Sequence, residues 1–317
     1  PPTLVICSNE FVRFLDENRL WDAALKGALA YADLQQRFLA GTLRDELIDN
    51  LRAYLQTVRE PLAVRSSSIL EDSHNLPLAG LYSTYMLPNS DDSLDQRLWS
   101  LLAAVKLVWA STFGDNPRAY FRQTSYRLED ERMAVVVQTL GGCRRGGYFY
   151  PTFSGVAQSH NFYPISYMKP EDGVAQIALG LGKTVVEGGP IVRFCPRYPM
   201  LLPQFADMRD WLYFTQKNFY ALDMEPIREP RDPATMDRLK LLPLSVAEGQ
   251  WVLQKVASVY QSDSGLLVDS FFYDGPRIVT FQKVLRDPRL KFGELLSSLL
   301  SICERSMRIP VEIEFAC

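Results

Sequence analysis

The stretch that most constrains the fold of this chain runs from residue 61 to residue 88 and reads PLAVRSSSILEDSHNLPLAGLYSTYMLP. It begins with a short apolar segment, typical of a buried strand, that ends at Arg65 and three serines. Gly80 opens a second strand-like segment in which Ser83 and Thr84 carry hydroxyl groups. Glycine lets the backbone approach a ligand, and arginine and hydroxyl side chains bind oxyanions. The pattern indicates a phosphate-binding site, although an ordinary strand exit with a solvated arginine explains Arg65 and the serines equally well.

The composition excludes several other classes of protein. The chain has 317 residues, of which 34 are Lys or Arg and 37 are Asp or Glu, so its net charge is -3 with both signs interspersed. This balance predicts no nucleic-acid-binding face and no polybasic membrane patch. No apolar run is long enough to span a bilayer, and 47% hydrophobic residues are typical of a globular protein. The five cysteines are scattered without a CxxC pair, which indicates free thiols in the cytoplasm rather than a disulfide framework or a zinc site.

Several other segments have a clear periodicity. Apolar residues at helical spacing predict helices over residues 92–111 and 291–307. The continuous apolar run over residues 133–140 predicts a strand covered on both faces. Residues 251–260 and 277–285 have the composition of strands in a final lobe.

The run AVRSSSILED…LAGLYSTYML resembles a signature of the ATP-binding domain that phosphoenolpyruvate synthase, pyruvate phosphate dikinase and rifampicin phosphotransferase share, VRSS(A/S)xxED…(F/L)AGxxxTY. Further segments of the same domain follow in the same order, namely VWASTF, VVVQ, SGVA, GLGK and EIEFA. The resemblance covers nearly the whole chain and implies an α+β fold of the ATP-grasp type with two or more lobes. We therefore expect residues 1–317 to form one multi-lobed ATP-binding region, with lobes at about 1–195 and 196–317.

The resemblance also implies nucleotide-binding roles for two residues in the middle of the chain. Gln138 occupies the position of a glutamine that lies near the nucleotide in the family, whereas a strand-end glutamine often only satisfies a neighbouring backbone group. Lys183 replaces the glutamate that follows GLG in the family. A lysine there would neutralise phosphate charge or lie in solvent, and the sequence favours neither. Glu187 is a weaker candidate for a displaced acid.

The last strand-like segment, VEIEFAC, carries two carboxylates two residues apart. Side chains alternate along a strand, so Glu312 and Glu314 are expected on one face, where paired carboxylates suit Mg²⁺. The segment resembles the family's DIE(W/F)A, whose second acid is a metal and nucleotide ligand; Glu314 matches it, and Glu312 replaces the aspartate. We expect the chain ends to be cuts through a longer polypeptide, because the family's Gly-Gly-Lys loop and Gln-x-Arg segment would lie outside this chain.

The function implied by the resemblance is binding of Mg²⁺ and ATP for phosphoryl transfer to a histidine on a separate domain, with a pyruvate or phosphoenolpyruvate site also elsewhere in the full polypeptide. Arg65 and Glu314 would act in the transfer, and His74 and His160 lack the sequence that surrounds the family's histidine. An alternative is a nucleotide-binding regulatory or scaffold protein that kept this fold and lost the chemistry, because Lys183 and the residues after SGVA depart from the pattern. A third hypothesis, a structural protein with incidental matches, predicts no nucleotide binding.

Overall fold

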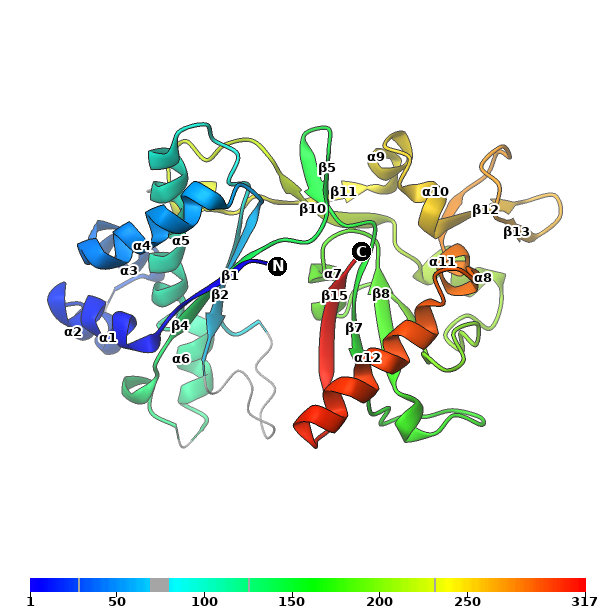
Figure 1. The fold of residues 1–317 in the computed structure, drawn as a ribbon, viewed down its shortest axis with the longest axis horizontal. Coiled ribbons are helices and arrows are strands. Elements are labelled where there is room, and N and C mark those ends of the chain that lie inside the picture. The colour runs from blue at the N-terminus through cyan, green and yellow to red at the C-terminus, as the bar shows by residue number, and fades with distance from the viewer. Residues whose placement is uncertain (28, 69–79, 125, 231) are drawn as a thin grey trace. The chain divides into compact units, whose positions relative to one another are not determined.

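The computed structural model describes residues 1–27, 29–68, 80–124, 126–230 and 232–317 (Figure 1). Helices and strands both contribute substantially, which confirms the expected α+β class. The chain divides into two compact units, one of residues 1–140 and 222–239 and the other of residues 141–221 and 240–317. Residues 141–195 thus pack with the C-terminal part of the chain. The expected lobes at 1–195 and 196–317 stay a prediction about functional organisation.

Unit 1 is built on an antiparallel sheet with the strand order β1-β4-β2-β3. Its strands are β1 (Thr3–Ile6), β2 (Leu62–Ser67), β3 (Thr84–Leu87) and β4 (Ala134–Thr139). Its helices are α1 (Ser8–Glu17), α2 (Trp21–Lys26), α3 (Tyr31–Ala40), α4 (Asp45–Thr57), α5 (Leu94–Ser111) and α6 (Asp115–Phe121), with 3-10 turns η1 (Leu128–Asp130) and η3 (Pro233–Met236). The helix expected over residues 92–111 is confirmed as α5, which starts after a Ser93 cap.

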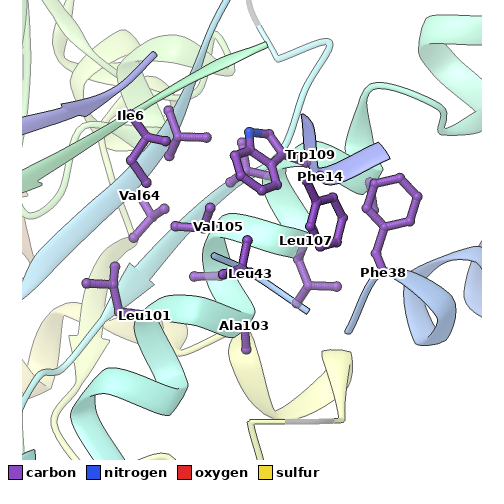
Figure 2. Close-up of a cluster of buried hydrophobic side chains, with 14 of the residues drawn as sticks. Ile6, Phe14, Phe38, Leu43, Val64, Leu101, Ala103, Val105, Leu107 and Trp109 are labelled. Carbon is purple, nitrogen blue, oxygen red and sulfur yellow. The ribbon is translucent and has the colours of Figure 1, made fainter. Parts of the chain in front are cut away.

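Helix α5 is the central packing element of unit 1. Its apolar side chains are buried around most of the helix, and it contacts strands β2, β3 and β4 as well as helices α3 and α4. Figure 2 shows Trp109 at the end of this helix beside Phe14, with Val105 near Val64 of the sheet. The Trp109 and Phe14 ring centroids lie 5.1 Å apart. Each such buried side chain stabilises the fold by about 1.5–3 kcal/mol.

The register of the unit 1 sheet separates a buried apolar face from a more exposed face, called the polar face, on which Val136 and Ala63 lie beside the polar side chains. Leu4, Val137 and Val64 lie opposite one another on adjacent strands and belong to the buried core or pack against it. Because side chains alternate, Arg65 and Gln138 point to the other face. Strand β4 is therefore covered fully on one face only: its burial alternates, so the prediction of a strand covered on both faces was wrong.

The described residues of unit 2 form three sheets. The strand orders are β15-β7-β8-β9, β11-β10-β6-β5 and β13-β12-β14. The strands are β5 (Cys143–Arg145), β6 (Tyr148–Tyr150), β7 (Ser154–Gln158), β8 (Val174–Ala178), β9 (Val192–Phe194), β10 (Asn218–Asp223), β11 (Leu239–Pro243), β12 (Ala257–Gln261), β13 (Leu266–Val268), β14 (Arg277–Val279) and β15 (Glu312–Ala316). The helices are α7 (Lys183–Val186), α8 (Met208–Phe214), α9 (Leu244–Gly249), α10 (Leu253–Val256), α11 (Gln282–Arg286) and α12 (Phe292–Met307), with a 3-10 turn η2 (Pro170–Asp172).

Helix α12 covers one face of the β15-β7-β8-β9 sheet (Figure 1). Phe292, in its first turn, meets Phe315 of β15 edge-on, with ring centroids 5.7 Å apart. The Phe315 ring crosses Gly155 of β7, where a Cβ atom would come within 2.5 Å of the ring. Glycine at this position therefore lets the strands and the helix pack closely. The helix expected over residues 291–307 is confirmed, whereas the strands expected over 251–260 and 277–285 each include a short helix.

None of the helices within the described ranges combines the length and the hydropathy needed to cross a membrane.

Candidate functional site

The first group of candidate residues lies on the polar face of the unit 1 sheet. Arg65 on β2 pairs directly with Thr84 on β3, and both side chains are exposed. Gln138 on β4 pairs with Ala63, two residues from Arg65 and on the same face. Directly opposed side chains in a sheet have Cβ atoms about 4.5–5.5 Å apart. The fold therefore brings Arg65, Thr84 and Gln138 together on one accessible polar surface.

Gln138 has a hydrogen-bond partner on the neighbouring edge strand. Its Nε2 donates to Thr3 Oγ1 at 3.0 Å, and the Thr3 hydroxyl donates to the Pro1 carbonyl at 3.0 Å. The partner is thus a side chain rather than the backbone group that a strand-end glutamine often satisfies. The Gln138 amide is oriented within the polar face by this contact.

Gly80 and Ser83 are placed differently from Arg65 and Thr84. Gly80 is exposed at φ 78°, a left-handed conformation that favours glycine, and no atom lies within 4 Å of an added Cβ. The Ser83 amide donates to Ser111 Oγ at 3.0 Å. Tyr85, two residues further along and on the same side as Ser83, packs against the buried core, and burial raises the pKa of its phenol. Ser83 is thus not brought together with Arg65 and Thr84.

The acidic and histidine positions of the opening motif, Glu71, Asp72 and His74, lie outside the described residues. His160 is described: its ring meets that of Phe162 edge-on, with centroids 4.7 Å apart.

The second group of candidate residues lies on the β15-β7-β8-β9 sheet of unit 2. Glu312 and Glu314 are both exposed and alternate with partly buried Ile313 and Phe315, which confirms that the two carboxylates share a face. Glu312 lies opposite Gln158, whose Nε2 donates to the Glu312 carboxylate. This face is opposite to the one that carries Phe315 and packs against α12.

The face that carries the two carboxylates continues across the four strands, with apolar Val156 between Glu314 and Gln176. Glu314 pairs with Val156, Val156 with Gln176, and Gln176 with Arg193.

In the described part of the chain no cluster of three or more His, Cys, Asp or Glu side chains has the arrangement of a metal site. Glu312 and Glu314 thus present two carboxylates on one face, and a cation bound there would need further ligands from elsewhere.

Lys183 begins the short helix α7 directly after the glycine turn. Its ammonium lies 3.7 Å from Glu187 Oε1 and 5.0 Å from the centroid of the Tyr220 ring. The Tyr220 hydroxyl donates to Glu187 Oε2 at 3.3 Å. Lys183 is therefore neither buried nor simply solvated, because an acid and an aromatic ring flank it.

The glycine turn itself is held from two sides. Ser154 Oγ donates to the Gly180 carbonyl at 2.7 Å, and the Leu181 amide donates to the Tyr220 carbonyl at 2.9 Å. Gly180 has φ 85°, and a Cβ there would lie 2.5 Å from the Tyr220 carbonyl oxygen. The sequence did not single out Tyr220, since it lies about forty residues from the turn and only tertiary pairing connects the two.

Comparison with known proteins gives the chain's relationships. Residues 1–199 match the family described as "Pyruvate phosphate dikinase, AMP/ATP-binding domain". The chain is 29% identical over 191 residues to the uncharacterised phosphotransferase YvkC of Bacillus subtilis, a match that covers 59% of this chain and 20% of that protein. It is 31% identical over 129 residues to a probable phosphoenolpyruvate synthase of Archaeoglobus fulgidus, a match that covers 40% of this chain and 14% of that protein.

Each match therefore spans a fifth or less of the relative's own length. The family match covers well over half of this chain and includes both the Arg65 strand and the Lys183 turn. The chain belongs to the AMP/ATP-binding domain family of pyruvate phosphate dikinase.

Proposed function

We propose that this chain is the ATP-binding module of a phosphotransferase that resembles phosphoenolpyruvate synthase and pyruvate phosphate dikinase, and that it binds Mg²⁺ and ATP for phosphoryl transfer to a histidine on a separate domain. The observation that carries the proposal is the polar face of the unit 1 sheet, where Arg65, Thr84 and Gln138 converge in a chain of this family.

Phosphoryl transfer depends mainly on positioning and on neutralising oxygen charge. Arg65 would bind phosphate oxygens through its planar guanidinium, and Thr84 would donate a hydroxyl hydrogen bond to the same group. Gln138, whose amide donates a hydrogen bond to Thr3, would donate or accept a hydrogen bond at a polar group of the nucleotide. Gly80 would allow the turn before β3 to keep its left-handed conformation beside the ligand. Ser83 is left out of this set because it lies on the opposite side of the strand from Thr84 and its amide already donates to Ser111.

Unit 2 would supply the metal ligands and one further cation. Two exposed carboxylates on one strand face fit the preference of Mg²⁺ for oxygen ligands. Glu314 would be the principal ligand, and Glu312, whose carboxylate accepts a hydrogen bond from Gln158, would be the second. When bound, Mg²⁺ neutralises charge on the phosphate oxygens. Lys183 would add a positive charge that attracts a phosphate group.

The ATP-grasp type of fold is part of the proposal. It is supported by two separately packed units, each with a sheet that buries one face against helices and presents polar candidate ligands on the other. The region would extend over residues 1–317. The receiving histidine and a pyruvate or phosphoenolpyruvate site would belong to other parts of the full polypeptide, in the cytoplasm, where the five cysteines remain thiols.

Turnover tests this proposal directly. The full polypeptide is incubated with Mg²⁺ and ATP labelled at the β-phosphate, with and without pyruvate, and AMP and labelled phosphohistidine are quantified. Formation of AMP that requires both Mg²⁺ and Arg65 supports the proposal. ATP binding without AMP or any phosphorylated protein would overturn the transfer step.

A regulatory or scaffold protein that binds nucleotide without chemistry is the second candidate. One specific observation favours it: Lys183, which replaces the family's acid, already has a carboxylate 3.7 Å away, that of Glu187. The two candidates differ in one result, since the scaffold binds ATP but leaves it intact over long incubation.

A further inference from the structure

Tyr220 contacts the glycine turn, Lys183 and Glu187 at the same time. Its backbone carbonyl accepts the Leu181 amide, its ring lies under the Lys183 ammonium, and its hydroxyl donates to Glu187. Tyr220 comes from β10, far along the chain from the turn, and lies beyond the residues that match the family. Tyr220 thus contacts both Lys183, the first residue of α7, and Glu187, which follows its last residue.

A phosphate group bound at Lys183 would compete with Glu187 for the ammonium. A charge-assisted hydrogen bond between an ammonium and a carboxylate is about 2.7–2.9 Å long. The Lys183 to Glu187 distance of 3.7 Å is longer, and no side chain or carbonyl in the described ranges accepts a hydrogen bond from the ammonium. Lys183 is therefore attracted by Glu187 while its three donors remain available to an anion.

The Tyr220 hydroxyl explains why Glu187 does not close on Lys183. It engages Oε2 at 3.3 Å, whereas Lys183 faces the other oxygen, Oε1. The aromatic ring also attracts the ammonium from its own side. Without the hydroxyl, the carboxylate is free to rotate toward Lys183 and form a short ion pair.

We propose that Tyr220 is a positioning residue that holds Glu187 back from Lys183 and so keeps the ammonium available to the phosphates of a nucleotide. This inference rests on the proposed function, since it takes nucleotide phosphates as the anion. It assigns Tyr220 no contact with the nucleotide itself. Glu187 then competes with the nucleotide phosphates for the Lys183 ammonium, so removal of the Glu187 carboxylate strengthens ATP binding.

A double-mutant cycle tests the inference. ATP affinity is measured by calorimetry for the parent protein, Tyr220→Phe, Glu187→Gln and the double variant. Because exposed ion pairs are weak, Tyr220→Phe should raise the Kd for ATP about three-fold and Glu187→Gln should lower it by a similar factor. In the Glu187→Gln background, Tyr220→Phe should have no effect, since a neutral amide does not compete for the ammonium. Tyr213→Phe, at a largely exposed tyrosine of α8, is the control for loss of a hydroxyl in unit 2.

The outcomes separate a positioning role from a packing role. If Tyr220 only supports the turn, Tyr220→Phe weakens binding equally in both backgrounds, and the inference is overturned while the proposed function stands. If the parent protein binds no ATP under conditions where it is folded, the proposed function falls and this inference falls with it. A Tyr220→Phe effect that disappears with Glu187→Gln and shrinks as salt is raised supports the inference.

Discussion

The Gly155→Ala variant tests whether close packing around Gly155 stabilises the unit 2 sheet that carries Glu312 and Glu314. In this strand an added Cβ would lie 2.3 Å from the Gln176 carbonyl oxygen and 2.5 Å from Phe315 Cζ. The carbonyl belongs to the neighbouring strand and cannot rotate away, so β7 and β8 must separate or β15 must shift. Overpacking of this kind costs about 1–3 kcal/mol, while replacing a strand glycine by alanine returns about 0.5–1 kcal/mol. We expect a net loss of about 2 kcal/mol in the free energy of unfolding, near the upper part of this range.

The assay is urea unfolding of the parent, Gly155→Ala and Gly147→Ala, combined with hydrogen exchange of peptides from β7 and β15. Gly147 is the matched control because its added Cβ meets no atom within 4 Å. Gly155→Ala should lower the urea midpoint and deprotect both strands, and Gly147→Ala should do neither. Equal midpoints for the two variants would refute the packing argument and, with it, the stated reason for a glycine in the SGVA segment.

Three further predictions concern individual side chains. Thr84→Val should weaken ATP binding about two- to ten-fold, because it removes one hydroxyl donor. Ser83→Ala should leave ATP affinity unchanged and lower the urea midpoint. A reversed pattern would contradict the assignment of the two hydroxyls to opposite sides of the strand. Glu314→Gln should abolish the part of ATP affinity that depends on Mg²⁺, measured by titration with and without chelator, and an unchanged Mg²⁺ dependence would exclude Glu314 as a ligand. Burial raises the pKa of the Cys195 thiol, so iodoacetamide should label Cys195 far more slowly than exposed Cys143 at mildly alkaline pH. Peptide mass spectrometry measures the two labelling rates, and equal rates would contradict the burial of Cys195.

Strong periodicity made parts of the fold predictable. The spacing of apolar residues gave the correct extent of α5 to within two residues, because an amphipathic or buried helix this long has no comparable strand pattern. Alternation placed Glu312 and Glu314 on one face of β15 for the same reason. Both predictions depend only on local geometry and not on what packs against the element.

Predictions that depended on tertiary packing were less successful. Strand β4 is rich in valine, and β-branched residues favour a strand whether or not its second face is covered, so the sequence did not reveal the polar face that carries Gln138. The short apolar run before β12 formed helix α10, since a segment of four residues fits either structure. Likewise, α11 follows β14 within a run that was expected to be one strand.

In the candidate site too, local geometry was predictable from the sequence and tertiary contacts were not. The motif identified Arg65 and Thr84 as neighbours, and the strand register pairs them. Ser83 is adjacent in sequence but points away, because consecutive residues along a strand face opposite sides. Tyr220 had no sequence signal, since its role depends on β10 reaching the Gly180 turn through a tertiary bridge.

The measurement that tests the central claim most directly is a calorimetric titration of the protein with ATP and Mg²⁺, run beside Arg65→Ala and Arg127→Ala. Arg127 is an exposed arginine of the same unit that pairs with Glu129 and controls for the loss of one positive charge. A charge-assisted hydrogen bond contributes about 1.5–3 kcal/mol, so Arg65→Ala should weaken ATP binding at least ten-fold while Arg127→Ala leaves it unchanged. Equal ATP affinity for all three proteins would contradict the assignment of the phosphate site to the polar face at Arg65.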